Sequence, residues 1–117
     1  MEYLKKRISA FKYAFKGVYL LFRHEAHALI HLIAAIGVIT AGFLFKISGI
    51  EWCVICLCIG GVFTAEGFNT AIEKLGDKIT SDQDSFIGAA KDIAAGAVLL
   101  MAITSAVIGC IIFIPKL

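Results

Sequence analysis

Three long apolar runs, separated by short polar segments, place the strongest limit on what this sequence can fold into. They cover residues 26–45, 52–72 and 93–114. A helix of about 20 apolar residues spans the roughly 30 Å of hydrocarbon in a lipid bilayer. Hydrophobic residues make up 60% of the 117 residues and charged residues only 17%, a balance that a soluble domain rarely has. We therefore predict an all-α integral membrane protein with three transmembrane helices.

Residues 1–24 have a different pattern, because their apolar residues recur at spacings of three and four. On a helix these positions form one narrow stripe that is bordered by lysines and arginines. The stripe consists of Leu4, Ile8, Phe11, Phe15, Val18 and Phe22. A helix with such a stripe lies in the headgroup layer of a membrane. The sequence therefore predicts an N-terminal amphipathic surface helix over residues 1–24, within a single membrane-embedded domain over residues 1–117.

Two polar segments connect the predicted spans. Residues 46–51 form a short hairpin between the first two. The second helix is expected to continue past the membrane to about Lys78. Residues 79–90 hold a polar, turn-prone run and are expected to form the main loop, with the third helix opening at residues 89–92.

The distribution of lysine and arginine predicts the orientation of the chain. Most of the eleven such residues precede the first span or flank the loop at 79–90, whereas Lys46 and Lys116 lie on the other side. The positive-inside rule therefore places the N-terminus and this loop in the cytoplasm, and the C-terminus outside.

An acidic face follows the apolar part of the second helix. Five polar residues share this face, within roughly 100° of arc at the helical period: Glu66, Asn69, Thr70, Glu73 and Asp77. Three carboxylates on one face repel each other, and a divalent cation with the phosphates it carries would balance them. The predicted topology brings Glu25, Lys91 and Asp92 to the same cytoplasmic edge. This pattern favours phosphoryl transfer from ATP to a lipid alcohol, in which carboxylates hold Mg²⁺ and one more takes the hydroxyl proton.

The residue pattern alone leaves other classes of protein open. A proton- or cation-coupled transporter also keeps acids in a membrane span. A structural membrane subunit is a third alternative, in which Glu66 would have no chemical role. The net charge of +2 and the lack of nucleic-acid-binding motifs argue against a nucleic-acid partner.

Two further patterns have simpler explanations than a site. Cys53 and Cys56 form a C-x-x-C pattern inside an apolar run, and we expect them to be packed as small apolar side chains. His27 and His31 lie one helical turn apart on one face, but Glu25 lies well round the helix from His27. We therefore expect interfacial hydrogen bonds from both histidines in preference to a metal site.

Two linked segments resemble the motifs of the small prokaryotic diacylglycerol kinase family, which includes the undecaprenol kinases. Residues 66–77 match the pattern Glu-x-x-Asn-Ser/Thr-Ala-Ile-Glu-x-x-x-Asp. Residues 90–99 match Ala-Lys-Asp-x-Ala/Gly-Ala/Ser-Ala/Gly-Ala-Val-Leu. The similarity extends to Tyr13, Phe15, Lys16, Gly17 and Glu25, and so covers nearly the whole chain. It favours the kinase over the transporter.

The resemblance implies a homotrimer in a prokaryotic inner (cytoplasmic) membrane, with active sites between neighbouring protomers at the cytoplasmic edge. It implies that Glu66 is the catalytic base, that Asn69 helps to order it, and that Glu25 and Glu73 bind ATP through Mg²⁺. Further contacts to the nucleotide are expected from Lys6, Tyr13, Asp82, Asp84, Lys91 and Asp92. Contacts to the lipid substrate are expected from Phe15, Trp52 and Glu66.

The expected acceptor is the hydroxyl of diacylglycerol, which would yield phosphatidic acid; undecaprenol, which would yield undecaprenyl phosphate, is the alternative. The sequence departs from the family pattern at residues 82–86, where many members have a Glu/Asp-x-His segment. It also departs at Gly67 and Gly76, where larger or β-branched residues are common. Each glycine is expected to loosen its helix by roughly 1 kcal/mol relative to alanine.

Overall fold

The computed structural model describes residues 1–117, apart from the side chain of His24. The chain forms the helices α1 (Glu2–His24), α2 (Ala26–Leu44), α3 (Gly49–Ile79) and α4 (Ser85–Phe113), and a short 3₁₀ turn, η1 (Ile114–Lys116), follows α4. Three helices are long and apolar enough to cross a membrane, namely α2, α3 and α4 with η1. The predicted all-α architecture with three membrane-spanning helices is therefore confirmed.

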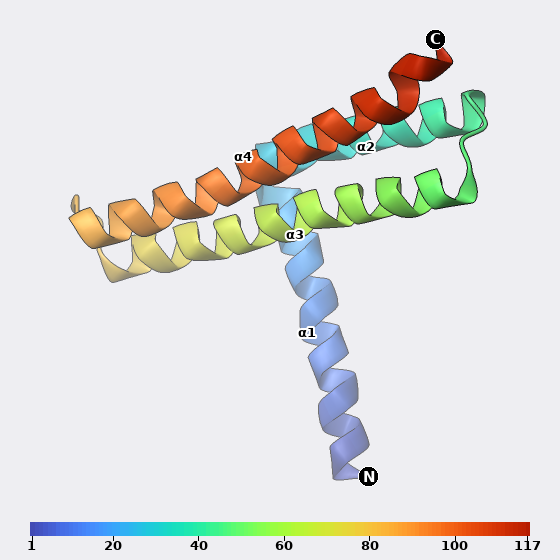
Figure 1. Ribbon diagram of the computed structural model, residues 1–117. Coiled ribbons are helices and arrows are strands. Elements are labelled where there is room, and N and C mark those ends of the chain that lie inside the picture. The colour runs from blue at the N-terminus through green and yellow to red at the C-terminus, as the bar shows by residue number, and fades with distance from the viewer.

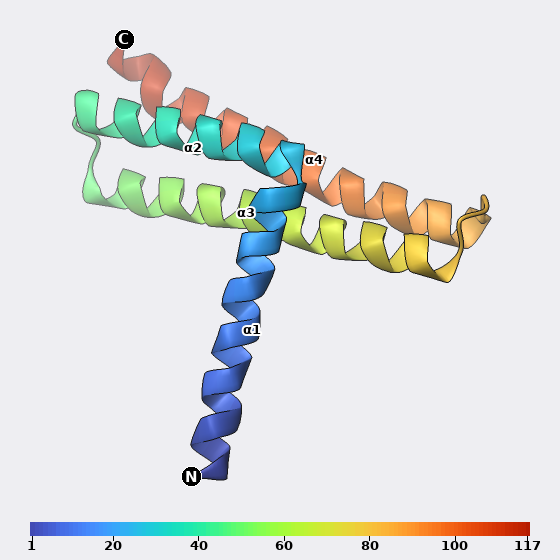
Figure 2. The same cartoon turned by 180° about the vertical axis from the view of Figure 1, so that it is seen from behind.

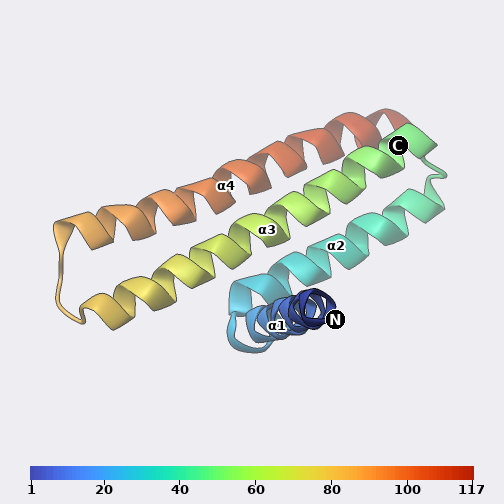
Figure 3. The same ribbon diagram turned by 90° about the horizontal axis from the view of Figure 1, so that it is seen from below.

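Helix α3 lies between α2 and α4 in the view from below (Figure 3), whereas α2 and α4 both lie on the same side of α3 in Figure 1, so the three helices form a V with α3 at its vertex. Helices α3 and α4 run antiparallel along most of their length, whereas α2 lies along only the first half of α3 (Figure 1). Helix α1 leaves these three helices at a steep angle near the middle of α3, as the view from behind also shows (Figure 2). The molecule is therefore flat and branched, with extents of 50 × 46 × 20 Å.

The corner between α1 and α2 packs against the middle of α3. The ring centroids of Phe22 and Phe63 lie 5.2 Å apart, and Leu21 lies beside Gly67. Past this corner, residues 67–79 and 85–93 continue together beyond the start of α2 (Figure 1). We call these two segments the α3–α4 arm. The arm carries Asn69, Glu73, Lys91 and Asp92 of the predicted site.

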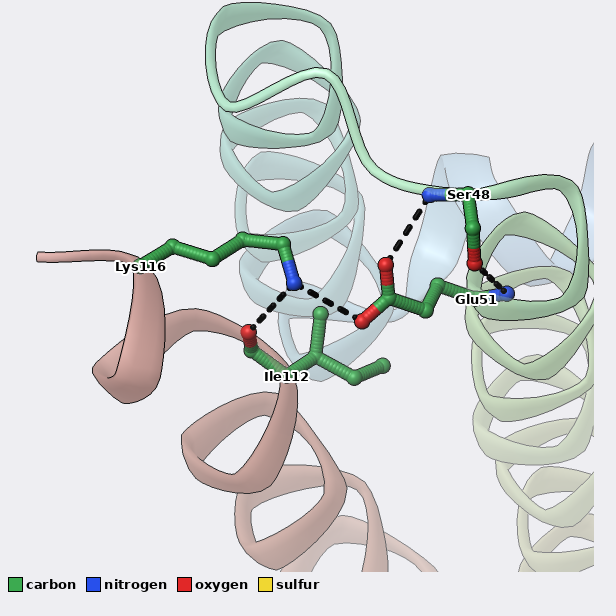
Figure 4. Close-up of polar contacts among 4 residues, drawn as sticks. All are labelled: Ser48, Glu51, Ile112 and Lys116. Carbon is green, nitrogen blue, oxygen red and sulfur yellow. Dashed lines mark hydrogen bonds and ion pairs between the residues drawn. The ribbon is translucent and has the colours of Figure 1, made fainter.

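A polar cluster joins the helices at the other end of the bundle (Figure 4). Ser48 Oγ accepts a hydrogen bond from the backbone N–H of Glu51, and the Glu51 carboxylate accepts one from the backbone N–H of Ser48. Lys116 Nζ donates to Glu51 Oε2 at 2.9 Å and to the Ile112 carbonyl at 3.2 Å. The hydrogen bond from the backbone N–H of Ser48 lowers the pKa of Glu51, and the hydrogen bond from Lys116 lowers it further. Glu51 precedes the span at 52–72.

The loop between α3 and α4 is shorter than the sequence pattern predicts. It covers residues 80–84, where a loop over 79–90 is expected. Helix α4 begins at Ser85 because the Asp84 carboxylate accepts hydrogen bonds from the backbone N–H groups of Phe86 and Ile87. The predicted opening of this helix at residues 89–92 is therefore wrong.

Few apolar side chains are buried within the single chain. The buried ones are Ala28, Ala35, Ile47, Ile55, Cys58, Val62, Ala94 and Ile112. Large side chains such as Leu57 and Ile93 are each 75% exposed. An apolar surface of this extent needs lipid or further helices to cover it, as expected for a multi-pass membrane protein.

Candidate active site

Glu66 is almost completely enclosed, with 2% of its surface exposed. It lies on α3 at the level of the corner between α1 and α2. Its Oε2 atom is 3.4 Å from Nε2 of His31 on α2. A carboxyl group at this depth is costly unless a polar partner compensates it, and the His31 imidazole is the polar group within reach of Oε2.

Asn69 and Thr70 extend the polar face of α3 by one helical turn from Glu66. Asn69 Oδ1 and Thr70 Oγ1 are buried, and neither has a hydrogen-bond partner among the described residues. Buried polar groups are normally paired. These two oxygen atoms therefore have hydrogen-bonding capacity for a group from outside the protomer.

Lys91 on the α3–α4 arm forms an ion pair with Asp77. Gly76 permits this close packing, because a Cβ atom there would lie 3.0 Å from Lys91 Cε and 3.0 Å from Ile87 Cγ2. The hydrogen bond from Lys91 to Asp77 raises the pKa of the Lys91 ammonium, and the charges of Asp77 and Glu73 add to this effect. Lys91 precedes the span at 93–114. Its ammonium group is therefore fixed in place by Asp77 and lies near the charge of Glu73.

An apolar groove of about 320 Å³ runs between α2, α3 and α4 and reaches His31. Its walls include Ala35, Val38, Ile55, Val62 and Phe63. His31 and Ser105 are the hydrogen-bonding side chains of its lining. The groove therefore has room for part of an apolar chain whose polar end meets His31.

The pattern of the family described as prokaryotic diacylglycerol kinase matches residues 12–113. The chain belongs to this family. It is 44% identical to the undecaprenol kinase of Bacillus subtilis over 114 residues, which are 97% of this chain and 93% of that protein. It is 35% identical to the diacylglycerol kinase of Synechocystis sp. over 109 residues, which are 92% of this chain and 62% of that protein.

Membership in this family makes the chain a lipid kinase, a phosphotransferase with an alcohol acceptor. The kinase predicted from the linked motifs is therefore confirmed. The transporter and the structural subunit, which the residue pattern alone left open, are set aside.

The other predicted site residues of the kinase are spread over the protomer. Glu25 is half-buried in the corner between α1 and α2, and Glu73 is half-buried on the α3–α4 arm. Lys6, Tyr13 and Phe15 are exposed on α1, which extends away from the other three helices (Figure 1). Most of α1 is therefore separated from α3 within the single chain (Figure 1).

Two of the three acidic residues predicted at the nucleotide lie at the tip of the α3–α4 arm, and the third lies further along α4. Asp82 is exposed in the loop, where its backbone N–H donates to Thr80 Oγ1. Asp84 is exposed and caps α4, and Asp92 is exposed one residue beyond Lys91. The structure brings them to the same end of the molecule as Lys91. Their contacts to ATP stay predictions.

Trp52 lies at the far end of α3 from the acidic face. Its ring lies 4.8 Å from the ring of Phe43 and covers Gly42, where an added Cβ would be 2.6 Å from a tryptophan carbon. Between residues 52 and 66 the helix rises by roughly 21 Å. The structure therefore packs Trp52 with the apolar cluster near the hairpin, and its contact with substrate stays a prediction.

The acidic residues of the kinase could bind a metal ion that enters the site together with the nucleotide. Among the described residues, no three His, Cys, Asp or Glu side chains gather into a metal-binding cluster. Mg²⁺ is usually held by one or two carboxylates, with phosphates and water completing its shell. The half-buried carboxylates of Glu25 and Glu73 are donors of the right kind for this mode of binding, and their role as ligands stays a prediction.

Sequence reasoning missed two contacts of the site. It treats His31 as an interfacial residue, whereas the structure places it beside Glu66. It puts Asp77 on the acidic face without naming a partner, whereas the structure pairs Asp77 with Lys91. A usable signal for His31 exists, because a titratable side chain inside a membrane span generally faces another polar group. No spacing rule identifies which group that is.

Proposed function

We propose that this kinase transfers the γ-phosphate of ATP to undecaprenol and releases undecaprenyl phosphate and ADP. The observation that carries this choice is the 44% identity to an undecaprenol kinase over 97% of the chain. The apolar groove that reaches His31 supports an acceptor with an extended apolar chain. Diacylglycerol, the substrate that the motifs first suggested, is the second candidate and is supported by the 35% identity to a diacylglycerol kinase.

The proposed setting is the cytoplasmic face of a prokaryotic inner membrane, with the N-terminus in the cytoplasm. Helix α1 would lie in the headgroup layer while α2, α3 and α4 cross the bilayer. The steep angle between α1 and the other three helices supports this arrangement (Figure 1). Glu66 would then lie at headgroup depth, and the α3–α4 arm would reach into the cytosol, where ATP is available.

In the proposed reaction, the hydroxyl oxygen of the lipid attacks the γ-phosphorus of ATP and the bond from phosphorus to ADP breaks. Glu66 takes the hydroxyl proton as general base. Asn69 lies one helical turn from Glu66 and has an unpaired buried oxygen, which supports a role in ordering the acceptor. Lys91 would contact the phosphates, and its ion pair with Asp77 keeps it charged and in place.

Mg²⁺ on the ATP phosphates would be held by Glu25 and Glu73. The ion would supply positive charge against the phosphate oxygens. Of the lipid contacts, Phe15 would lie near the headgroup and Trp52 near the distal part of the chain. The separation of the two residues along the molecule supports this division.

The complete site would form between protomers of a homotrimer. Lys6 and Tyr13 belong to α1, which extends away from the Glu66 of its own chain (Figure 1). A neighbouring protomer would bring its own Lys6 and Tyr13 to the nucleotide that Lys91, Asp92, Asp82 and Asp84 contact. The large exposed apolar surface of the single protomer supports such an assembly.

The decisive experiment measures transfer of labelled phosphate from ATP in detergent micelles with Mg²⁺, with undecaprenol and diacylglycerol offered separately. We expect product from undecaprenol, and a rate roughly 10²–10⁴-fold lower in Glu66→Gln because a general base typically contributes this much. Glu51→Gln, the same change at the far end of α3, is the matched control and should keep the rate. Product from diacylglycerol alone would refute the substrate choice, and product from neither lipid would refute the function.

A further inference from the structure

One carboxylate oxygen of Glu66 lies close to a histidine of the neighbouring helix α2. Oε2 lies 3.4 Å from Nε2 of His31. The Glu66 side chain is 3% exposed and the His31 side chain 22% exposed. Of the two residues, His31 is the one that lines the apolar groove. His31 therefore stands between the buried carboxylate and the space available to an apolar chain.

We propose that His31 is the positioning residue of Glu66. Its imidazole N–H would hold Oε2, so that Oε1 is aimed at the hydroxyl of the lipid. A base that is itself oriented by a further group is a recurring arrangement in enzymes that activate a hydroxyl. This inference rests on the proposed role of Glu66 as the base and adds the group that fixes its geometry.

The neighbouring polar side chains do not offer a substitute for His31. The hydroxyls of Thr70 on α3 and Ser105 on α4 are buried without a hydrogen-bond partner in the described chain, so neither holds the carboxylate. His27 lies one turn earlier on α2 and is exposed. His31 is therefore the titratable side chain from a neighbouring helix that lies within ion-pair distance of Glu66 among the described residues.

The test compares three variants of the full-length protein in the undecaprenol assay. His31→Leu removes the N–H and should lower kcat roughly 10–100-fold, the effect of misplacing a catalytic group by about 1 Å, while KM for ATP stays unchanged. His31→Gln places an amide N–H at a similar reach and should recover most of the lost rate. His27→Leu is the matched control on the same helix and should keep the parent rate.

The outcomes separate this inference from the proposed function. If Glu66→Gln is inactive but folded His31→Leu keeps the parent kcat, His31 does not position the base and the proposed function stands. If Glu66→Gln is as active as the parent, the proposed function fails and this inference fails with it. If His31→Leu does not fold, His31→Asn takes its place, because its shorter amide cannot reach Oε2. Equal losses in the Gln variant and in the Leu or Asn variant would overturn the inference, because a donor at this position would then have no effect.

Discussion

Replacing Gly76 with alanine tests whether the close packing of α3 and α4 holds Lys91 for ATP. A Cβ atom at this position would lie 3.0 Å from Lys91 Cε and 3.0 Å from Ile87 Cγ2, so both neighbours would have to move by a few tenths of an ångström. The Lys91 ammonium is also tied to Asp77. The methyl group therefore pushes on a side chain whose charged end is already held.

Two effects of opposite sign act on the stability of this variant. Alanine favours a helix over glycine by about 1 kcal/mol, and an extra methyl group in a close-packed contact costs about 1–3 kcal/mol. The atoms that must move belong to side chains, one of them a flexible lysine, which places the cost at the low end. We therefore expect a change in the free energy of unfolding close to zero. The effect on KM for ATP should be larger. Complete loss of a charge-assisted hydrogen bond to phosphate raises KM roughly tenfold or more, and a displaced Lys91 would lose part of such a hydrogen bond.

The assay measures kcat and KM for ATP at saturating lipid, together with thermal unfolding in the same detergent. Gly67→Ala is the matched control, because the atom nearest to its added Cβ is Leu21 Cδ2 at an ordinary 3.9 Å. The control should be slightly more stable than the parent and should keep the parent KM for ATP. If Gly76→Ala and Gly67→Ala have the same KM for ATP, the packing at Gly76 does not position Lys91 and the reasoning is refuted.

Three further predictions concern the same helices. Asp77→Asn removes the group that raises the pKa of Lys91, so the ammonium should lose its proton at a lower pH, nearer its ordinary pKa of about 10.4. The rise in KM for ATP at alkaline pH should therefore begin at a lower pH than in the parent. A rise that begins at the same pH in both proteins would contradict this. Asp84→Ala removes the N-cap of α4 and should lower the free energy of unfolding by about 1 kcal/mol in thermal or denaturant unfolding, whereas Asp84→Asn should retain most of it. Lys116→Ala removes the hydrogen bonds to Glu51 and the Ile112 carbonyl, and it should lower the unfolding temperature while phosphate transfer stays at the parent rate, because these groups lie at the other end of the bundle.

The membrane-spanning helices could be predicted from the sequence because each depends on its own length and apolarity. The loop at 79–90 could not, because its true extent depends on one side chain. Asp84 satisfies the first free N–H groups of α4, and this allows the following residues, Ser85 to Ala90, to join the helix in place of the loop. A polar run marks where a turn is possible, but the capping group decides where the turn ends.

The contacts of the site depend on how neighbouring helices are rotated and shifted, which no single-helix pattern contains. The helical period correctly puts Glu66 and Glu73 on one face of α3. It does not say that His31 of α2 meets Glu66, since that requires the relative register of two helices. The pairing of Lys91 with Asp77 is likewise a consequence of how closely α4 approaches Gly76.

The lengths of α2 and α3 explain why one helix carries both the lipid end and the nucleotide end of the proposed site. Helix α2 has 19 residues and is about 28 Å long, close to the thickness of a bilayer core. Helix α3 has 31 residues and is about 46 Å long, so it exceeds α2 by roughly 18 Å. Along α3, Glu66 lies about 26 Å from the start at Gly49, which is almost the full length of α2. The first turns of α2, which carry His31, therefore come level with Glu66. In the proposed setting, the polar residues of α3 beyond Glu66 would extend past the bilayer core toward ATP.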